Sequence, residues 1–128
     1  MVARGQGGKI VLVSSVLGLV AAPALAPMPA YTAAKGAIVN LTRELAIEYA
    51  SKGITVNALC PALYRTNIGT GMFLDEEGPV TKMFAAYQPL GKTAVPEEIR
   101  GPALFLASSA SDYMTGQMLV MDAGWTAR

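Results

Sequence analysis

The sequence predicts an α/β fold in which three parallel strands alternate with helices. Short, continuously apolar runs at residues 9–14, 54–59 and 118–121 are typical of strands that are buried on both faces of a parallel sheet. A helical pattern separates the first two runs, and a long excursion with a further helix separates the last two. This alternation favours parallel strands that are joined by right-handed crossovers.

The first strand is expected at Lys9–Ser14, and an Ala/Pro-rich loop at Pro23–Pro29 follows it. A helix is expected over Ala30–Ser51, because apolar residues recur there at helical spacing and Gly53 supplies a C-terminal stop. The apolar residues at helical spacing in this segment are Ala34, Ile38, Leu41 and Leu45.

The second strand is expected at Ile54–Leu59. The excursion Leu63–Gly91 is punctuated by glycines and includes a short helix at Val80–Tyr87. Segments of this length are usually functional lids or binding loops. Pro96 opens another helix, which is expected to run to about Ser108, and the third strand is expected at Met118–Met121.

Composition excludes several classes of protein. The 128 residues form one domain or part of one, and a hydrophobic content of 52% excludes a disordered tail. A net charge of +1 without a basic run predicts no nucleic-acid partner and no membrane-surface partner. The single cysteine permits no internal disulfide, which predicts a reducing, cytoplasmic location. The absence of histidine argues against a metal site.

The uncharged stretch from Ile10 to Ala34 allows a weaker alternative. Ala24-Leu25-Ala26 has the pattern of a signal-peptidase site, so a secreted domain that begins at Pro27 is a competing hypothesis. Three prolines interrupt the stretch, which argues against a transmembrane helix. A strand followed by a loop remains the better interpretation.

Tyr31 and Lys35 carry the strongest chemical signal. They are four residues apart on a predicted helix, so the phenol and the ammonium share one face. A free tyrosine has a pKa near ~10 and transfers protons poorly at neutral pH, whereas a nearby cation favours the phenolate. Ser15 lies upstream, and its hydroxyl can hydrogen-bond a substrate oxygen. Together these groups can move a proton to or from a carbinol or carbonyl oxygen.

Each of these residues also has a structural explanation. A Tyr-x-x-x-Lys pair alone is common by chance, and a serine at a strand end often satisfies backbone groups. Thr66 can cap a helix, and Cys60 can be a buried packing residue. The apolar residues of the excursion can form either a substrate lid or core; they are Met72, Phe73 and Met83.

Taken in order, four motifs from Gly7 to Arg128 resemble the short-chain dehydrogenase/reductase family. They are Ser15, Tyr31-x-x-x-Lys35, Asn57-x-x-x-Pro61 with Thr66, and Asp122-Ala-Gly124-Trp125. The resemblance implies a partial Rossmann-type, doubly wound parallel sheet and an oxidoreductase that interconverts an alcohol and a carbonyl by hydride transfer. It implies NAD or NADP as the cofactor, a small-molecule alcohol or carbonyl substrate, and a homo-oligomer as the intact enzyme.

The resemblance also implies a role for each site residue. Tyr31 would be the general acid/base, Lys35 would support it, and Ser15 would orient the substrate oxygen. The residues that would contact the cofactor are Tyr31, Lys35, Pro61, Ala62 and Thr66. The C-terminal tail is similar to the sugar-acid dehydrogenases of the family, so a sugar acid or related polyol is the expected substrate.

Several features depart from the family pattern. The interval from Ser15 to Tyr31 is a few residues longer than usual, which makes Ser14 an alternative. Pro61-Ala62 replaces the usual Pro-Gly, and Asp122-Ala123-Gly124 replaces Asp-Gly-Gly.

The glycine-rich turn of the cofactor-binding half is missing from the sequence. Gly5-Gln-Gly-Gly8 does not replace it, because this segment precedes a strand, whereas the phosphate-binding turn follows a strand and opens a helix. Residues 1–128 are therefore expected to be the C-terminal half of a single NAD(P)-binding Rossmann-type domain, without its N-terminal half. The alternative function is a catalytically inactive truncated fragment or an assembly module.

Overall fold

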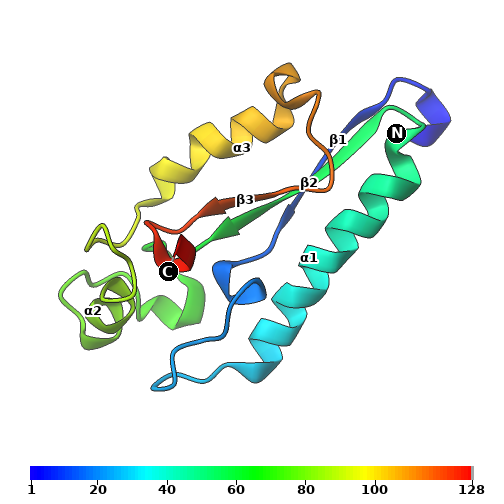
Figure 1. Cartoon of the computed structure of the whole chain (residues 1–128). Coiled ribbons are helices and arrows are strands. Elements are labelled where there is room, and N and C mark those ends of the chain that lie inside the picture. The colour runs from blue at the N-terminus through cyan, green and yellow to red at the C-terminus, as the bar shows by residue number, and fades with distance from the viewer. Residues whose placement is uncertain (128) are drawn as a thin grey trace.

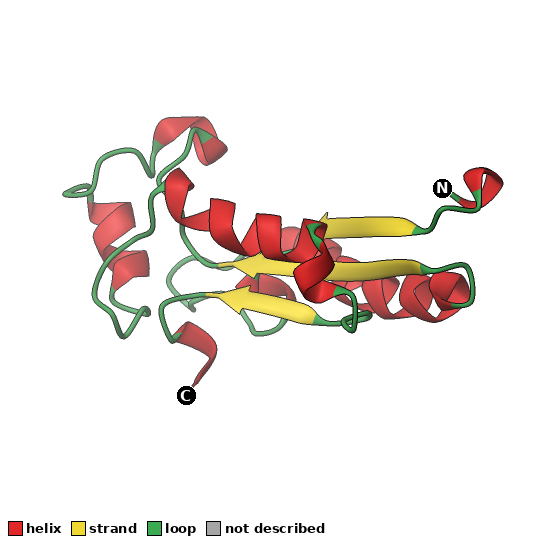
Figure 2. Cartoon of the chain, turned by 90° about the horizontal axis from the view of Figure 1, so that it is seen from above, coloured by secondary structure: helices red, strands yellow, loops and turns green. Residues whose placement is uncertain are grey.

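The computed structural model describes residues 1–127 and shows a parallel sheet between two helices (Figures 1 and 2). In this part of the chain, β1 (Gly8–Val13), β2 (Ile54–Pro61) and β3 (Met118–Met121) lie side by side in that order. Both neighbouring pairs are parallel. Helix α1 (Pro29–Ala50) covers one face and α3 (Arg100–Ala107) covers the other. The predicted α/β fold with parallel strands is confirmed.

The excursion contains α2 (Pro79–Ala85), which is shorter than the predicted helix. The helix that Pro96 opens starts as a 3₁₀ turn and becomes α-helical at Arg100. Other 3₁₀ turns lie at Val2–Arg4, Val16–Gly18, Ile68–Gly71, Ser109–Ser111 and Trp125–Ala127. Arg128, the last residue of the family resemblance, lies outside the described residues.

The two crossovers have opposite hands. The chain steps from β1 to β2 and from β2 to β3 in the same direction, but α1 and α3 lie on opposite faces (Figure 2). The connection through α1 is right-handed, and the connection through α3 is left-handed, so the prediction is wrong for the second. The right-handed rule applies to a strand that feeds its helix directly. Here residues 62–99 first pass around the carboxyl edge of the sheet (Figure 1).

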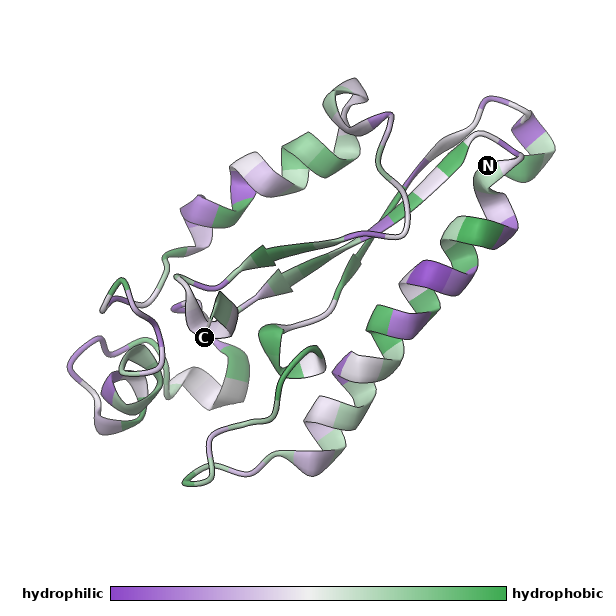
Figure 3. Ribbon diagram, viewed as in Figure 1, coloured by the Kyte–Doolittle hydropathy of each residue, from purple (hydrophilic) through white to green (hydrophobic). Residues whose placement is uncertain are grey.

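Helix α1 buries a different face from the one that its apolar spacing indicates. Leu41 is 47% exposed and Ala34 is also exposed, whereas Ile38 and Leu45 are half-buried. The predicted stripe is therefore displaced by about one position. Figure 3 shows no single continuous apolar stripe along α1, so periodicity could not select the face. The buried residues are Val39, Thr42 and Ala46.

The carboxyl edge of the sheet holds an aromatic core cluster, which consists of Val16, Leu17, Leu63, Phe84 and Trp125. The ring centroids of Phe73 and Phe84 are 5.8 Å apart, and those of Tyr87 and Trp125 are 5.3 Å apart. Phe73 and Met83 pack against the cluster, which favours the core alternative for these two residues. Met72 is exposed.

A side-chain latch joins β2 to the segment that enters β3. The buried Asn57 amide donates to the Met114 carbonyl at 2.9 Å and accepts from the Gln117 N–H at 3.0 Å. The Thr115 hydroxyl accepts from the Val56 N–H at 3.0 Å. Asn57 therefore has a structural role in the sheet, within the motif that carried the resemblance.

Ala123→Gly should stabilise the fold. Ala123 has φ 52°, which is the left-handed region that disfavours residues with a Cβ. Glycine removes this strain but adds unfolded-state entropy, so we expect the free energy of unfolding to rise by up to about 1 kcal/mol.

Urea denaturation measures this change. Ala37→Gly, at an exposed helical position of α1, is the matched control and should lose about 0.5–1 kcal/mol. Equal losses at both positions would contradict the strain argument.

Candidate functional site

Ser15, Tyr31 and Lys35 come from consecutive segments at the carboxyl edge of the sheet. Ser15 follows the end of β1 and caps the 3₁₀ turn Val16–Gly18, where its Oγ accepts from the Leu17 N–H at 3.1 Å. Tyr31 lies in the first turn of α1, and Lys35 lies one turn later. In parallel α/β sheets this edge is where ligands bind.

The Lys35 ammonium contacts the end of β1 and lies near the Tyr31 ring. Its Nζ donates to the Val13 carbonyl at 3.0 Å and is 5.6 Å from the centroid of the Tyr31 ring. The predicted shared face of Tyr31 and Lys35 is thus present. The hydrogen bond to the Val13 carbonyl holds the cation beside the ring. This contact could not be predicted from the sequence, because every residue type has a backbone carbonyl.

Tyr31 presents its hydroxyl without an internal partner. The side chain is half-buried and packs against the aromatic core cluster. Within residues 1–127, no group hydrogen-bonds its hydroxyl. The oxygen is therefore available to a bound molecule.

The two serines differ in their attachments. Ser14 is 2% exposed, and its Oγ donates to the Lys35 carbonyl at 2.7 Å. Ser15 is also buried, but its donated hydrogen bond to the Pro61 carbonyl is long, at 3.4 Å. Ser14 is committed to holding α1 against β1, so Ser15 is the better candidate for a substrate contact.

Of the three predicted cofactor residues at and after the end of β2, two already make hydrogen bonds within the chain. Ala62 donates its N–H to the Met121 carbonyl at 3.0 Å, and its methyl packs against the aromatic core cluster. The Thr66 hydroxyl accepts from the Ile68 N–H at 3.4 Å, as a turn-capping residue would. Pro61 ends β2 and is half-buried at the carboxyl edge.

Asp122 and Cys60 also have structural surroundings. The Asp122 carboxylate accepts from Gly124 N–H at 2.9 Å and from Thr126 N–H at 2.7 Å. Burial acts to raise the pKa of Asp122, but these hydrogen bonds lower it by more, so the group stays ionised. Burial raises the pKa of the Cys60 thiol, which fits the expected packing role.

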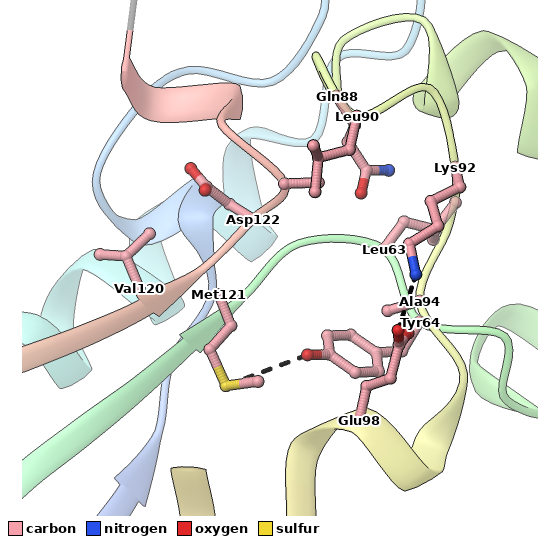
Figure 4. A pocket seen from close by; sticks show the side chains of 11 residues that line it. Leu63, Tyr64, Gln88, Leu90, Lys92, Ala94, Glu98, Val120, Met121 and Asp122 are labelled. Atoms are coloured by element: carbon pink, nitrogen blue, oxygen red, sulfur yellow. Dashed lines mark hydrogen bonds and ion pairs between the residues drawn. The ribbon is translucent and has the colours of Figure 1, made fainter. Parts of the chain in front are cut away.

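A cavity of about 380 Å³ lies beside the carboxyl ends of β2 and β3 (Figure 4). None of the six predicted site residues lines it. Sequence reasoning missed its polar residues, because they stand in different loops and form no motif. They include Tyr64, Gln88, Lys92 and Glu98.

Two further findings concern the described residues. Among residues 1–127, no cluster of three histidine, cysteine, aspartate or glutamate side chains could hold a metal ion. No helix in the same range is long and apolar enough to cross a membrane.

The profile of the family described as "Enoyl-(Acyl carrier protein) reductase" matches residues 1–126. A 2-dehydro-3-deoxy-D-gluconate 5-dehydrogenase of Dickeya dadantii is 39% identical over 125 residues, which is 98% of this chain and 47% of that protein. The chain belongs to the short-chain dehydrogenase/reductase family. A 3beta-hydroxysteroid dehydrogenase 2 of Eggerthella lenta is 41% identical over 97% of this chain and 46% of its own length.

Solved members of the family share the fold of this short-chain dehydrogenase/reductase chain. A gluconate 5-dehydrogenase from Burkholderia cenocepacia, in complex with NADP and tartrate, superposes with a TM-score of 0.86 at 33% identity. It is matched over 99% of this chain and 48% of its own. A 4-hydroxyisoleucine dehydrogenase with NADH gives a TM-score of 0.85 at 31% identity, over 98% of this chain and 50% of that one. The chain spans about half the length of the relatives it matches.

Proposed function

We propose that this chain supplies the proton-transfer half of an NAD(P)-dependent oxidoreductase that interconverts an alcohol and a carbonyl. One observation carries the proposal: the Lys35 ammonium is held by the Val13 carbonyl beside the Tyr31 ring, next to the turn that Ser15 caps. This arrangement places a cation against an available phenol at the ligand-binding edge of the sheet.

In the proposed reaction Tyr31 gives a proton to the carbonyl oxygen, or takes one from the alcohol. Ser15 hydrogen-bonds the same oxygen and holds it near the phenol. Lys35 stabilises the phenolate that remains after the proton has left. The nicotinamide, when bound, supplies or accepts the hydride.

The residues present fit the nicotinamide end of the cofactor. Lys35 donates one of its three ammonium hydrogens to Val13 and has others to offer a ribose. Thr66 accepts one hydrogen bond and can still donate its own hydroxyl hydrogen. Pro61 and Ala62 would line the nicotinamide ring. We place residues 1–128 as the C-terminal half of a Rossmann-type domain, whose other half would bind the phosphates.

The names of two relatives support a proposal for the substrate class. Those of Dickeya dadantii and Gluconobacter oxydans are named for sugar-acid dehydrogenation. We therefore extend the proposal to a sugar acid or related polyol as substrate, in a cytoplasmic homo-oligomer.

A second candidate is an inactive fragment or assembly module. Within the described chain β1 is an edge strand that pairs only with β2, and its last residue Val13 is exposed. An unpaired apolar edge of this kind favours pairing with another chain. A relative of Xanthobacter autotrophicus, 41% identical over 123 residues, is itself named as inactive.

One experiment separates the two candidates. The purified chain is tested for oxidation of NADH and NADPH with keto-sugar acids, alone and after mixing with the cofactor-binding half of the Gluconobacter relative. We expect little activity alone, and turnover when the second half is supplied. Turnover by the chain alone would overturn the half-domain assignment. A folded complex without turnover would favour the module.

A further inference from the structure

Asp122 builds the C-terminal turn, residues 122–126, which follows β3. Its carboxylate accepts three hydrogen bonds, from the Gly124 N–H at 2.9 Å, the Thr126 N–H at 2.7 Å and the Thr126 hydroxyl at 2.7 Å. Figure 4 shows the carboxylate pointing away from Lys92, which lines the same cavity. Hydrogen bonds to a charged acceptor are roughly twice as strong as neutral ones. The carboxylate therefore fixes the path of the chain through this turn.

The C-terminal turn places Trp125 in the aromatic core cluster. Trp125 stands between the two residues whose N–H groups donate to Asp122, and it is 7% exposed. Its ring centroid is 5.3 Å from that of Tyr87, with an interplanar angle of 27°, and 6.0 Å from that of Phe84. An aromatic ring of this size contributes much of the buried apolar area of a core, so its position decides how the cluster packs.

Two contacts join the C-terminal turn to the end of the excursion. The Leu90 N–H donates to the Ala123 carbonyl at 3.2 Å. At Gly124, where φ is 90°, a Cβ would lie 3.1 Å from Pro89 Cγ, so the two segments approach each other closely. The end of the excursion is thus held by the C-terminal turn through ring stacking, a hydrogen bond and close packing.

The aromatic core cluster connects Trp125 with the candidate site. Val16 and Leu17, which directly follow Ser15, are members of the cluster, and the Leu17 N–H donates to Ser15 Oγ at 3.1 Å. Tyr31 packs against the same cluster. Because packed interiors contain few voids, a displaced tryptophan would move the residues on which Ser15 and Tyr31 rest.

We infer that Asp122 is a positioning residue of the candidate site and acts through Trp125. Its carboxylate holds the C-terminal turn, the turn holds the tryptophan in the aromatic core cluster, and the cluster holds Tyr31 and Ser15 at the carboxyl edge of the sheet. The description as a positioning residue rests on the proposed function. The coupling between Asp122 and Tyr31 is a property of the fold, so it can be measured without turnover.

Fluorine NMR of the full chain labelled with 3-fluorotyrosine measures this coupling, because each of its five tyrosines gives its own signal. Single Tyr→Phe variants assign the signals. Asp122→Ala should shift the Tyr87 signal, because that ring stacks on Trp125, and should also shift the Tyr31 signal. The Tyr49 signal should keep its position, because Tyr49 packs against a different core cluster.

A milder variant and a matched control accompany Asp122→Ala. Thr126→Val removes one of the three hydrogen bonds and keeps the shape of the side chain, so it should shift the same two signals by less. This variant tests the inference if Asp122→Ala does not fold. Asp112→Ala is the control, because it removes an exposed carboxylate that pairs with Lys9, and it should leave both signals unchanged.

The position of the Tyr31 signal decides the outcome. A lower melting temperature with an unmoved Tyr31 signal would show a merely structural role for Asp122 and overturn the inference. The inference also fails if the Tyr87 signal shifts alone, or if Asp112→Ala shifts the Tyr31 signal as much as Asp122→Ala does. The expected shifts in a chain that shows no turnover would support the coupling and count against the proposed function instead.

Discussion

Tyr31→Phe should lower turnover by about 10²–10⁴-fold, the usual contribution of general acid–base catalysis. Phenylalanine keeps the ring that packs against the aromatic core cluster, so the fold should be unaffected. Only the hydroxyl is removed, and within residues 1–127 that hydroxyl supports no other group. The loss of rate would thus report proton transfer alone.

The rate is measured in whichever form turns over substrate, the chain alone or the chain joined to a cofactor-binding half. Tyr113→Phe is the matched control, since Tyr113 is fully exposed and distant in sequence from the site. The control should keep the parent rate. Near-normal turnover by Tyr31→Phe, with unchanged thermal stability, would rule out the role of Tyr31.

Gly18→Ala should destabilise the fold by about 1–3 kcal/mol, the usual cost of overpacking. A Cβ at Gly18 would lie 2.6 Å from the Lys35 carbonyl oxygen and 2.7 Å from Ser14 Oγ. The oxygen belongs to the backbone of α1, so it cannot rotate away. Relief requires α1 to move from the β1 end, which would also displace the Lys35 ammonium from Val13.

Urea denaturation measures the loss of stability. Gly101→Ala in α3 is the control, because a Cβ there meets nothing within 4 Å. Its stability should stay the same or rise by up to about 1 kcal/mol. If Gly18→Ala behaves like Gly101→Ala, the close approach of the Val16–Gly18 turn to α1 does not constrain the site.

The strands were the most predictable part of the fold. The runs at 54–59 and 118–121 match β2 and β3 closely, because buried parallel strands have a local signature of continuous apolar residues. The buried face of α1 and the hand of the second crossover depend on how distant segments pack. Leu41 carries no mark that distinguishes it from the buried Val39.

The same division applies to the candidate site. Tyr31 and Lys35 share a face because of helix geometry alone, so their spacing was enough to pair them. The contact from Lys35 to Val13, and the choice between Ser14 and Ser15, require the placement of β1 against α1. The residues that line the cavity beside β2 and β3, such as Tyr64 and Gln88, come together only in the folded chain.

The latch of Asn57 and Thr115 has a consequence for sequence variation. These side chains clamp the chain just before β3, so the register of β3 is set at its own entrance. A slip by one residue would reverse which side chains face α3. Insertions in the exposed stretch of residues 74–77 should therefore leave the sheet in register. This stretch can lengthen and change in sequence while Phe84 stays in the aromatic core cluster and the strands that support the site stay unchanged.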